Sequence, residues 1–441
     1  MEIPMERKPL IEDAGLFQTI VVMVFCHISV TFLCINVIFD LFIFGLPVLL
    51  LHSISILPSS LYYNLTSKII NWTTPIVYGI PMIFSGTTVY VDNAQILIEA
   101  KESNSLVLAN HGSRIDWMIG MFIGHVQSLG NSAKLGKRCR VGFVCEALIQ
   151  MMPIVGWYRK IICHDIFVWR SFDKDAPTIK KNIETFHDRQ QDRMLFLSPE
   201  GVIVDHNDAD KKYIQQCRQF CKDNGYKPFE YVLTPRYKGT TCLLDQVSGA
   251  RGGPVVSICA VFVRDGKLLN CKLVSQKRII PDIYDLNQGI AGKPISIYLH
   301  IRSIMVTKPH NSNCPFDAKA CLMNEYIWKD GVIAEWEERL EQNTVDAEWI
   351  SQFTQVGGEF KDIVFSHLYH VAVMIFPLIT LNCIYPFLKL VVWIFCVIAL
   401  THTMGWYVNT SSMESVPFET GIKAFGSFVV TLQGKSKKKN V

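Results

Sequence analysis

The sequence contains two long stretches that almost lack charge. Between residues 16 and 57 the single charged side chain is Asp40, and between residues 363 and 408 it is Lys389. Hydrophobic residues form 49% of the 441-residue chain and charged residues 19%, which is more apolar than a usual soluble domain. A helix of about 20 apolar residues spans a bilayer, so each stretch is long enough for two passes. We therefore interpret both stretches as membrane hairpins.

Other absences narrow the class of protein. The 14 cysteines include no C-x-x-C pair, and no set of cysteines and histidines has the spacing of a zinc site. Free thiols in a reducing compartment are the expected state, and no metal site is predicted. The net charge of +4 is mild and does not indicate a nucleic-acid partner. Basic residues on a chain with apolar ends would instead face the anionic lipids of a bilayer, which is the predicted partner.

The sequence between the apolar stretches alternates short strand patterns with helical ones, which is typical of an α/β domain with a mixed sheet. We predict an N-terminal membrane hairpin at residues 1–60, the α/β domain at 61–345, a C-terminal membrane hairpin at 346–410 and a basic tail at 411–441. The predicted fold class is thus α/β, flanked on both sides by hydrophobic helical hairpins.

The domain is organised around residues 105–120. The apolar run at 106–108 predicts a strand, and Ser113 is a suitable N-cap for a following helix, so His111 lies in the turn between them. In open α/β folds this crevice binds ligands, and the helix N-terminus offers N–H groups to an anion. The position suits chemistry on a phosphorylated or oxyanionic substrate.

Asp116 has two interpretations. Three residues after Ser113, it fits a capping box that serves only the helix. Five residues after His111, its carboxylate could instead hold the imidazole in one tautomer and stabilise the protonated ring. The spacing alone does not decide between the two.

Residues 110–117, NHGSRIDW, resemble the first motif of the glycerolipid acyltransferases, the lysophosphatidic acid acyltransferase family, in which N-H-x4-D-W recurs. The chain also resembles the branch that includes lysocardiolipin and lysophosphatidylinositol acyltransferases. The resemblance implies an acyltransferase domain that transfers a fatty acyl group from acyl-CoA to the free hydroxyl of a lysophospholipid. It implies His111 as general base, with Asp116 orienting the imidazole. No cofactor is implied, because acyl-CoA is a co-substrate.

A second motif ends in Pro153-x-x-Gly156-Trp157, and the apolar step after it closes on Arg170, as in similar acyltransferases. The resemblance implies that Arg170 binds the phosphate of the acceptor. Without it, the residue would be an ordinary surface arginine on an apolar stem. Many relatives have a lysine seven residues before the proline, where this chain has Glu146.

The sequence Ser198-Pro199-Glu200-Gly201 follows an apolar strand and resembles the third motif of the family, with Val202 in place of threonine. Under the resemblance, Glu200 hydrogen-bonds an acceptor hydroxyl or orders neighbouring loops, and Gly201 lets backbone N–H groups approach a phosphate. Without it, the segment would be a plain turn with a solvated Glu200.

A stretch of pattern V-L-x-P-R-x-x-G follows a strand predicted at residues 231–233 and is similar to the lysocardiolipin-type branch. Its Arg236 is a candidate ligand of the substrate phosphate, or only a loop charge. Lys238 has the same two interpretations.

Two other classes stay open. A serine hydrolase could use Ser113 or Ser198 with His111, but no G-x-S-x-G elbow occurs in the sequence. A catalytically degenerate membrane scaffold is the other class, because the chain departs from the family pattern at Glu146, at Val202 and at Phe262, the last in residues 254–263, which stand at the position of the fourth motif. The intact first motif argues against lost catalysis.

The basic tail bears on location. Lys438 and Lys439 stand at the fourth and third positions from the end, as in a dilysine retrieval signal of endoplasmic reticulum proteins. Lysine clusters also flank membrane segments on the cytosolic side. We therefore expect a multi-pass protein of the endoplasmic reticulum membrane whose catalytic domain is cytosolic, where acyl-CoA is available.

Overall fold

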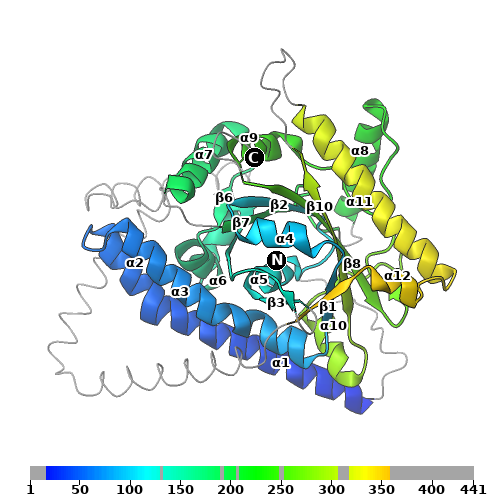
Figure 1. Cartoon of the computed structure of the whole chain (residues 1–441), viewed down its shortest axis with the longest axis horizontal. Helices are drawn as coiled ribbons and strands as arrows, with labels where there is room; N and C mark the ends of the chain where they lie inside the picture. Colours follow the sequence, from blue (N-terminus) through cyan, green and yellow to red (C-terminus); the bar gives the residue numbers. More distant parts are fainter. Residues whose placement is uncertain are drawn as a thin grey trace, which may run out of the picture.

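The computed structural model describes residues 16–129, 133–188, 193–204, 208–247, 253–305 and 317–357 (Figure 1). Within them one large sheet forms the centre and helices cover both of its faces, so the predicted α/β class with a mixed sheet is confirmed. The predicted C-terminal hairpin beyond residue 357 and the basic tail lie outside the described residues.

The sheet has eleven strands in this part of the chain, ordered β4-β3-β11-β1-β10-β8-β2-β7-β5-β6, with β9 paired to β8. Its strands are β1 (Thr88–Val91), β2 (Ser105–Ala109), β3 (Ser128–Leu129), β4 (Ala133–Lys134), β5 (Arg140–Glu146), β6 (Ile166–Val168), β7 (Arg193–Leu197), β8 (Val255–Arg264), β9 (Lys267–Leu268), β10 (Ser296–Ile304) and β11 (Thr354–Gly357). Parallel pairing joins β2 to β7, β7 to β5 and β5 to β6. These four strands end at one edge of the sheet, where ligands bind in open α/β folds.

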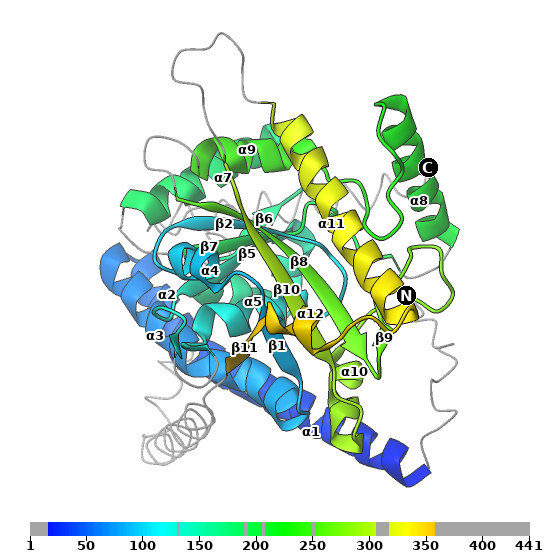
Figure 2. The same cartoon turned by 45° about the vertical axis from the view of Figure 1, so that its right-hand side comes forward.

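Helices pack on both faces of the sheet (Figure 2). They are α4 (Ala94–Lys101), α5 (Asp116–His125), η3 (Ala147–Met151), α6 (Val155–Tyr158), η4 (Arg159–Cys163), α7 (Phe172–Asp188), α8 (Asp208–Asp223), α9 (Tyr237–Val247), α10 (Ile283–Asn287), η5 (Gln288–Ala291), α11 (Ala318–Glu341) and α12 (Ala347–Ser351). On one face α5 buries Met118 and Phe122 in a core that includes Phe262 of β8. On the other face α11 crosses the strands diagonally and buries Tyr326 and Trp336. Each such side chain stabilises the fold by about 1.5–3 kcal/mol.

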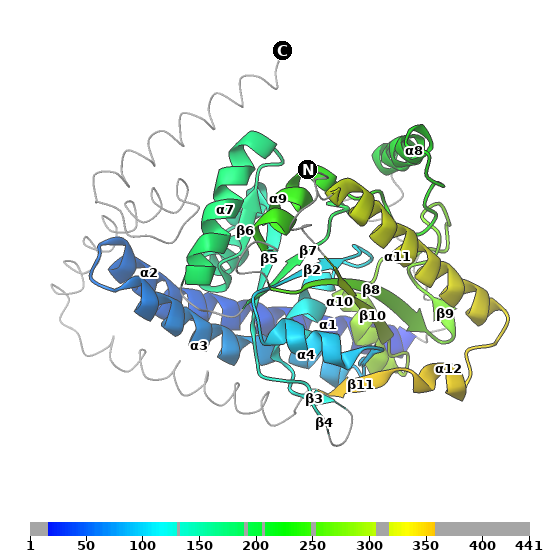
Figure 3. The same cartoon turned by 45° about the horizontal axis from the view of Figure 1, so that its top comes forward.

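The N-terminal apolar stretch forms one unbroken helical run, so the hairpin predicted within residues 1–60 is wrong in its extent. The run comprises α1 (Leu16–Phe39), η1 (Asp40–Gly45) and α2 (Leu46–Ser53), and the returning limb comprises α3 (Ser59–Tyr78) and η2 (Gly79–Phe84). Pro47 is tolerated because it closely follows the π-helical turn η1, where the regular α-helical hydrogen-bond pattern is already interrupted. Asp40 is tolerated because its buried carboxylate accepts a hydrogen bond from the Thr73 hydroxyl of α3. Figure 3 shows the two limbs side by side.

Residues Phe17–Ser53 form the one helix in the described part of the chain that is long and apolar enough to cross a membrane. Its 37 residues expose large apolar side chains, among them Phe17, Ile20, Val24 and Ile28. Such a row of exposed apolar side chains is unusual for a helix that faces water and suits contact with lipid or another apolar surface.

The strand predicted at residues 231–233 is wrong. The segment is irregular, and the backbone N–H groups of residues 230–232 donate to the carboxylate of Asp330 on α11 at 2.7–3.2 Å. A buried segment whose N–H groups bond a side chain satisfies its backbone as fully as a strand does. The apolar composition of the segment therefore did not distinguish a strand from a buried irregular segment.

The sheet also extends further along the chain than predicted. β11 pairs with β1 and β3, although the prediction assigned its residues to the C-terminal hairpin beginning at residue 346. A strand of four residues is too short to show a clear alternation in the sequence.

Candidate active site

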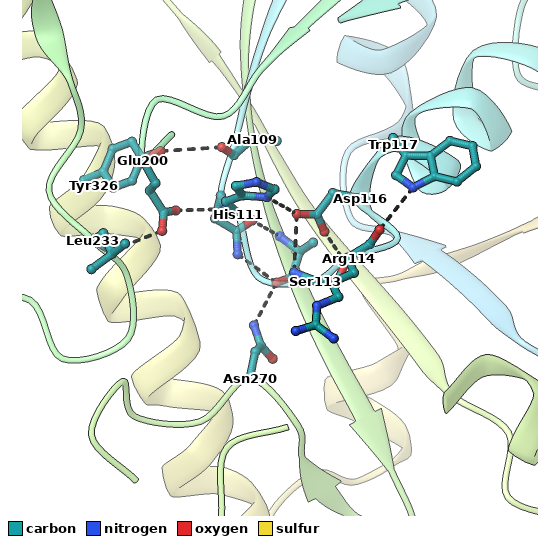
Figure 4. A network of polar contacts seen from close by, with 12 residues as sticks. Ala109, His111, Ser113, Arg114, Asp116, Trp117, Glu200, Leu233, Asn270 and Tyr326 are labelled. Atoms are coloured by element: carbon teal, nitrogen blue, oxygen red, sulfur yellow. Dashed lines mark hydrogen bonds and ion pairs between the residues drawn. The ribbon is translucent and has the colours of Figure 1, made fainter. Parts of the chain in front are cut away.

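His111 and Asp116 are hydrogen-bonded to each other just beyond the carboxyl end of β2 (Figure 4). The imidazole Nδ1 lies 2.8 Å from Oδ2 of Asp116. Because an ionised carboxylate only accepts, Nδ1 carries the proton and Nε2 keeps its lone pair. The ring is thus held in the tautomer that a base requires.

Asp116 also organises the turn that precedes α5. The predicted N-cap Ser113 is wrong, because α5 starts at Asp116 and Ile115 is the residue before its first turn. The Ser113 hydroxyl donates to Oδ1 of Asp116, and the Ser113 N–H lies 3.3 Å from Oδ2. One carboxylate therefore orients the imidazole and orders the turn before α5, without forming the capping box that the sequence left as an alternative.

The pKa of His111 is raised above its ordinary value. Burial alone would lower this pKa, but the hydrogen bond and the charge of Asp116 outweigh burial, with a further contribution from the charge of Glu200. The side chain is still 28% exposed, so a substrate hydroxyl has access to the ring. A more basic and accessible imidazole suits general-base chemistry.

Glu200 lies behind His111 and orders two loops. It is 3% exposed, so the interpretation of a solvated turn residue is wrong. Its Oε1 accepts the backbone N–H of His111 at 2.9 Å, and its Oε2 accepts the N–H of Leu233 at 3.2 Å. Burial raises the pKa of Glu200, and the two backbone N–H groups and the neighbouring imidazole oppose that rise.

Three polar residues support the carboxyl end of β2, and of these only Asn110, the first residue of the first motif, was singled out in the sequence. Lys329 of α11 donates from Nζ to the carbonyl of Leu108 at 2.7 Å, and burial lowers the pKa of Lys329 to about 8. Tyr326 donates to the carbonyl of Ala109 at 3.5 Å, and Asn110 exchanges two hydrogen bonds with the backbone of β8. The sequence signal for Lys329 is its helical spacing from Leu322, Tyr326, Ile333 and Trp336, which are buried on the same side of α11.

A cavity of about 760 Å³ opens in front of the His111–Asp116 pair. Five of the six predicted site residues line it, namely His111, Asp116, Arg170, Gly201 and Arg236, and Lys238 lines it as well. Apolar side chains form the remaining walls, among them Val144, Val168, Ile179, Phe196, Leu197 and Leu243. The sixth predicted residue, Glu200, lies behind the wall and not in it. The cavity therefore joins a base, several cations and an apolar surface.

Arg170 follows β6 and points into this cavity. It has a left-handed backbone, with φ of 61°, and its Nη2 lies 2.9 Å from the carbonyl oxygen of Gly201. The same nitrogen lies 3.1 Å from Oε2 of Glu146. Glu146, which stands where many relatives have a lysine, is therefore the ion-pair partner of Arg170, the candidate phosphate ligand.

Arg236 approaches Gly201 from another side. Its guanidinium lies 5.8 Å from the ring centroid of Tyr213, and a Cβ on Gly201 would come within 3.2 Å of Arg236 Nε. Gly201 has φ of +71°, a conformation that favours glycine, and its N–H already donates to the carbonyl of Ser198. Gly201 thus makes room for Arg236 and offers its carbonyl to Arg170.

The described residues contain no group of three or more His, Cys, Asp or Glu side chains placed to hold a metal ion. What they place together is an oriented imidazole, the guanidinium groups of Arg170 and Arg236, and apolar walls. This set can deprotonate a hydroxyl, bind a phosphate and receive an acyl chain.

Residues 89–259 match the model of the family described as Acyltransferase. Residues 89–259 therefore resemble an acyltransferase domain, and the family resemblance recognised from the motifs is confirmed. The matched range contains all six predicted site residues.

Curated relatives give a finer comparison. The chain is 27% identical over 233 residues to the probable 1-acyl-sn-glycerol-3-phosphate acyltransferase 5 of Arabidopsis thaliana, covering 53% of each chain. It is 26% identical to lysocardiolipin acyltransferase 1 of Mus musculus, covering 47% of this chain and 50% of that one. It is also 26% identical to lysophosphatidylinositol acyltransferase 10 of Caenorhabditis elegans, covering 48% of each chain. The chain thus spans about half the length of these relatives, and no solved structure matches it.

Proposed function

We propose that this chain is an acyl-CoA-dependent acyltransferase that transfers a fatty acyl group to the free hydroxyl of a lysophospholipid. The observation that carries the proposal is the 2.8 Å hydrogen bond between His111 and Asp116 in the wall of a cavity that also holds Arg170 and Arg236. The names of the relatives support a lysophospholipid acceptor, because they specify 1-acyl-sn-glycerol-3-phosphate, lysocardiolipin or lysophosphatidylinositol.

In the proposed reaction the acceptor hydroxyl oxygen attacks the thioester carbonyl carbon while Nε2 of His111 takes the hydroxyl proton. Asp116 keeps Nδ1 protonated and stabilises the imidazolium that forms. The C–S bond then breaks, and the imidazolium returns the proton to the leaving CoA thiolate. The products are an ester on the lipid and free CoA, formed without a covalent enzyme intermediate.

The walls of the cavity suit both substrates. Arg170 and Arg236 offer planar donors to the acceptor phosphate, whose oxygens they can bind in pairs. Ile179 and Leu243 are buried side chains that offer an apolar surface to an acyl chain. In this arrangement Glu200 acts as a positioning residue, because it holds the backbone of His111 and lines no part of the cavity.

We also propose that the enzyme is a multi-pass protein of the endoplasmic reticulum membrane with a cytosolic catalytic domain. The apolar helix Phe17–Ser53, the apolar stretch at 363–408 and the lysine cluster at 435–439, which is typical of the cytosolic side, support this location. The test is the accessibility of an epitope inserted before Lys435 to antibody after selective permeabilisation of the plasma membrane. Access only after the endoplasmic reticulum membrane is also opened would contradict the cytosolic orientation.

The activity is tested with membranes that contain the full chain, labelled acyl-CoA and a panel of lysophospholipids. We expect transfer to one or a few acceptors, and we expect it to fall at least about 100-fold in His111→Ala, as for a lost general base. His27→Ala on the exposed surface of α1 is the matched control and should keep the rate.

Two outcomes would favour the other classes of protein. Transfer by the wild type to none of the acceptors would support the membrane scaffold. Release of free fatty acid from acyl-CoA that is lost in Ser198→Ala would support a serine hydrolase, because Ser198 also lines the cavity. Transfer that survives in His111→Ala would overturn the assignment of the base.

A further inference from the structure

Glu146 places a negative charge beside a candidate phosphate ligand. It is the last residue of β5, and its Oε2 lies 3.1 Å from Nη2 of Arg170. Both side chains are 39% exposed and both line the cavity, so the ion pair faces the space that a substrate would fill. Ion pairs this exposed are weak, and Arg170 is free to exchange its partner for a phosphate while Glu146 stays in the wall.

The other acidic groups of the cavity accept hydrogen bonds from residues of their own turns. Among the described lining residues these are Asp116 and Asp175. Asp116 accepts from His111. The carboxylate of Asp175 accepts the backbone N–H groups of Trp169 and Ser171, on either side of Arg170, at 2.7 and 2.9 Å. Glu146 is therefore the lining carboxylate that pairs with the Arg170 guanidinium itself, and a phosphate bound to that guanidinium would meet it.

The charge of the phosphate then decides how well an acceptor fits. A phosphate monoester carries about 1.5 to 2 negative charges at pH 7, whereas a diester carries one. When a phosphate replaces Glu146 as the partner of Arg170, it lies within a few ångströms of the Glu146 carboxylate. The carboxylate would repel a second negative charge on that phosphate. A hydroxyl on the far side of a diester could instead donate to the carboxylate, which is a strong acceptor.

We propose that Glu146 is a specificity-determining residue that selects lysophospholipids with a monoanionic phosphodiester and a hydroxyl-bearing headgroup over phosphomonoester acceptors. The proposal rests on the proposed function and narrows its substrate class. Both the repulsion of the second charge and the hydrogen bond to the headgroup act through one carboxylate, so single substitutions of Glu146 test them.

The experiment measures kcat/KM with membranes of the full chain and four acceptors of one acyl chain length. Lysophosphatidic acid is the monoester, lysophosphatidylinositol and lysophosphatidylglycerol are diesters whose headgroups bear hydroxyls, and lysophosphatidylcholine is a diester whose headgroup bears none. We expect the wild type to prefer the hydroxylated diesters. Glu146→Gln should shift the ratio towards the monoester by about tenfold, the effect of one screened charge pair, mainly through KM.

Two further variants separate charge from a general disturbance of the site. Glu146→Asp keeps the charge and should keep most of the preference. Glu184→Gln removes an exposed carboxylate that is paired with a lysine on α7 outside the cavity, and it should leave the ratio unchanged.

The outcomes distinguish this inference from the proposed function. No transfer to any acceptor by the wild type would overturn both. Transfer with a wild-type preference for the monoester, or with a ratio unmoved by Glu146→Gln, would overturn the role of Glu146 and leave the acyltransferase assignment intact. Equal use of lysophosphatidylcholine and the hydroxylated diesters would overturn the hydrogen bond from the headgroup.

Discussion

The backbone N–H of His111 donates to the buried carboxylate of Glu200 at 2.9 Å, although the two residues are 89 positions apart. The other oxygen of that carboxylate accepts the N–H of Leu233, three residues before Arg236. One side chain therefore fixes the loop that carries the candidate base and the loop that carries a candidate phosphate ligand. Asp116 orients the imidazole ring, and Glu200 holds the backbone beneath it.

Glu200→Gln should weaken both the fold and the reaction. A carboxylate accepts both N–H groups, whereas a carboxamide has one accepting oxygen and would turn its NH2 towards a donor. An unsatisfied buried donor costs about 1–3 kcal/mol of unfolding free energy, and the shifted His111 backbone should lower kcat at least about tenfold. Thermal unfolding and acyl transfer measure the two effects. Glu341→Gln at the exposed end of α11 is the control, and equal behaviour of the two variants would contradict the role of Glu200.

Asp116→Asn should move the pH dependence of the reaction. The base must be neutral, so kcat/KM falls as pH drops through the pKa of His111, which Asp116 and Glu200 hold above its ordinary value. Loss of the Asp116 charge lowers that pKa and shifts the acid limb to lower pH. The maximal rate should fall by about 100-fold or more, because the imidazolium loses its partner. An acid limb that stays in place while the rate falls would show that another group titrates.

Lys329→Met tests the support beneath β2 through the pH dependence of stability. Burial lowers the pKa of Lys329 from its ordinary 10.5 to about 8, so the unfolded chain binds more protons between those pH values. The contribution of Lys329 to the free energy of unfolding therefore becomes more favourable as pH rises from 8 to 10.5. In Lys329→Met the unpaired Leu108 carbonyl lowers the free energy of unfolding by about 1–3 kcal/mol. Because the variant has no cation to bury, its free energy of unfolding does not rise with pH as that of the wild type does. The difference between the two proteins should therefore grow from pH 8 to 10.5.

Denaturant unfolding at several pH values measures this difference. Lys180→Met, at an exposed position of α7, should show no such trend relative to the wild type. A deficit of Lys329→Met that is constant from pH 8 to 10.5 would mean that the lysine is not a buried cation in the folded protein.

Gly201→Ala should weaken acceptor binding, and a second glycine offers a matched control. Gly201 and Gly225 both have positive φ, of +71° and +74°, so alanine at either position costs about 1–2 kcal/mol of stability. A Cβ at Gly201 would press on Arg236, whereas a Cβ at Gly225 meets nothing within 4 Å. We expect only Gly201→Ala to raise KM for the lysophospholipid. Equal KM values in the two variants would contradict the role of Arg236 in binding the acceptor.

Local patterns in the sequence predicted the parts of the fold that depend on neighbouring residues. The apolar runs at 106–108 and 194–197 are β2 and β7. The contact between His111 and Asp116 is one of the two arrangements that their spacing left open. The grouping of Arg170 and Arg236 at the same cavity was expected only from the family resemblance, and the structure places both there. Their roles in binding stay predictions.

Contacts between distant residues were not predictable from local patterns. The partner of Asp40 is Thr73 on the returning helix, so the sequence alone did not show that a carboxylate could be buried inside an unbroken helical run. The residues 231–233 have the composition of a strand, but Asp330, about 100 positions later, satisfies that backbone. In both cases a residue far along the chain, Thr73 or Asp330, supplies the hydrogen bond, and no pattern of neighbouring residues indicates it.

The parallel pairing of β2 with β7 has a consequence for folding order. His111 and Asp116 can meet as soon as their own turn forms, but the carboxylate that anchors this turn lies 89 residues further along the chain. At ribosomal rates of about 5–20 residues per second, Glu200 is synthesised roughly 4–18 s after His111. Until β7 pairs with β2, the pair is a local turn without its anchor. The candidate active site is therefore complete only after this non-local pairing has formed, and a chain that ends before β7 would contain the whole first motif without a site.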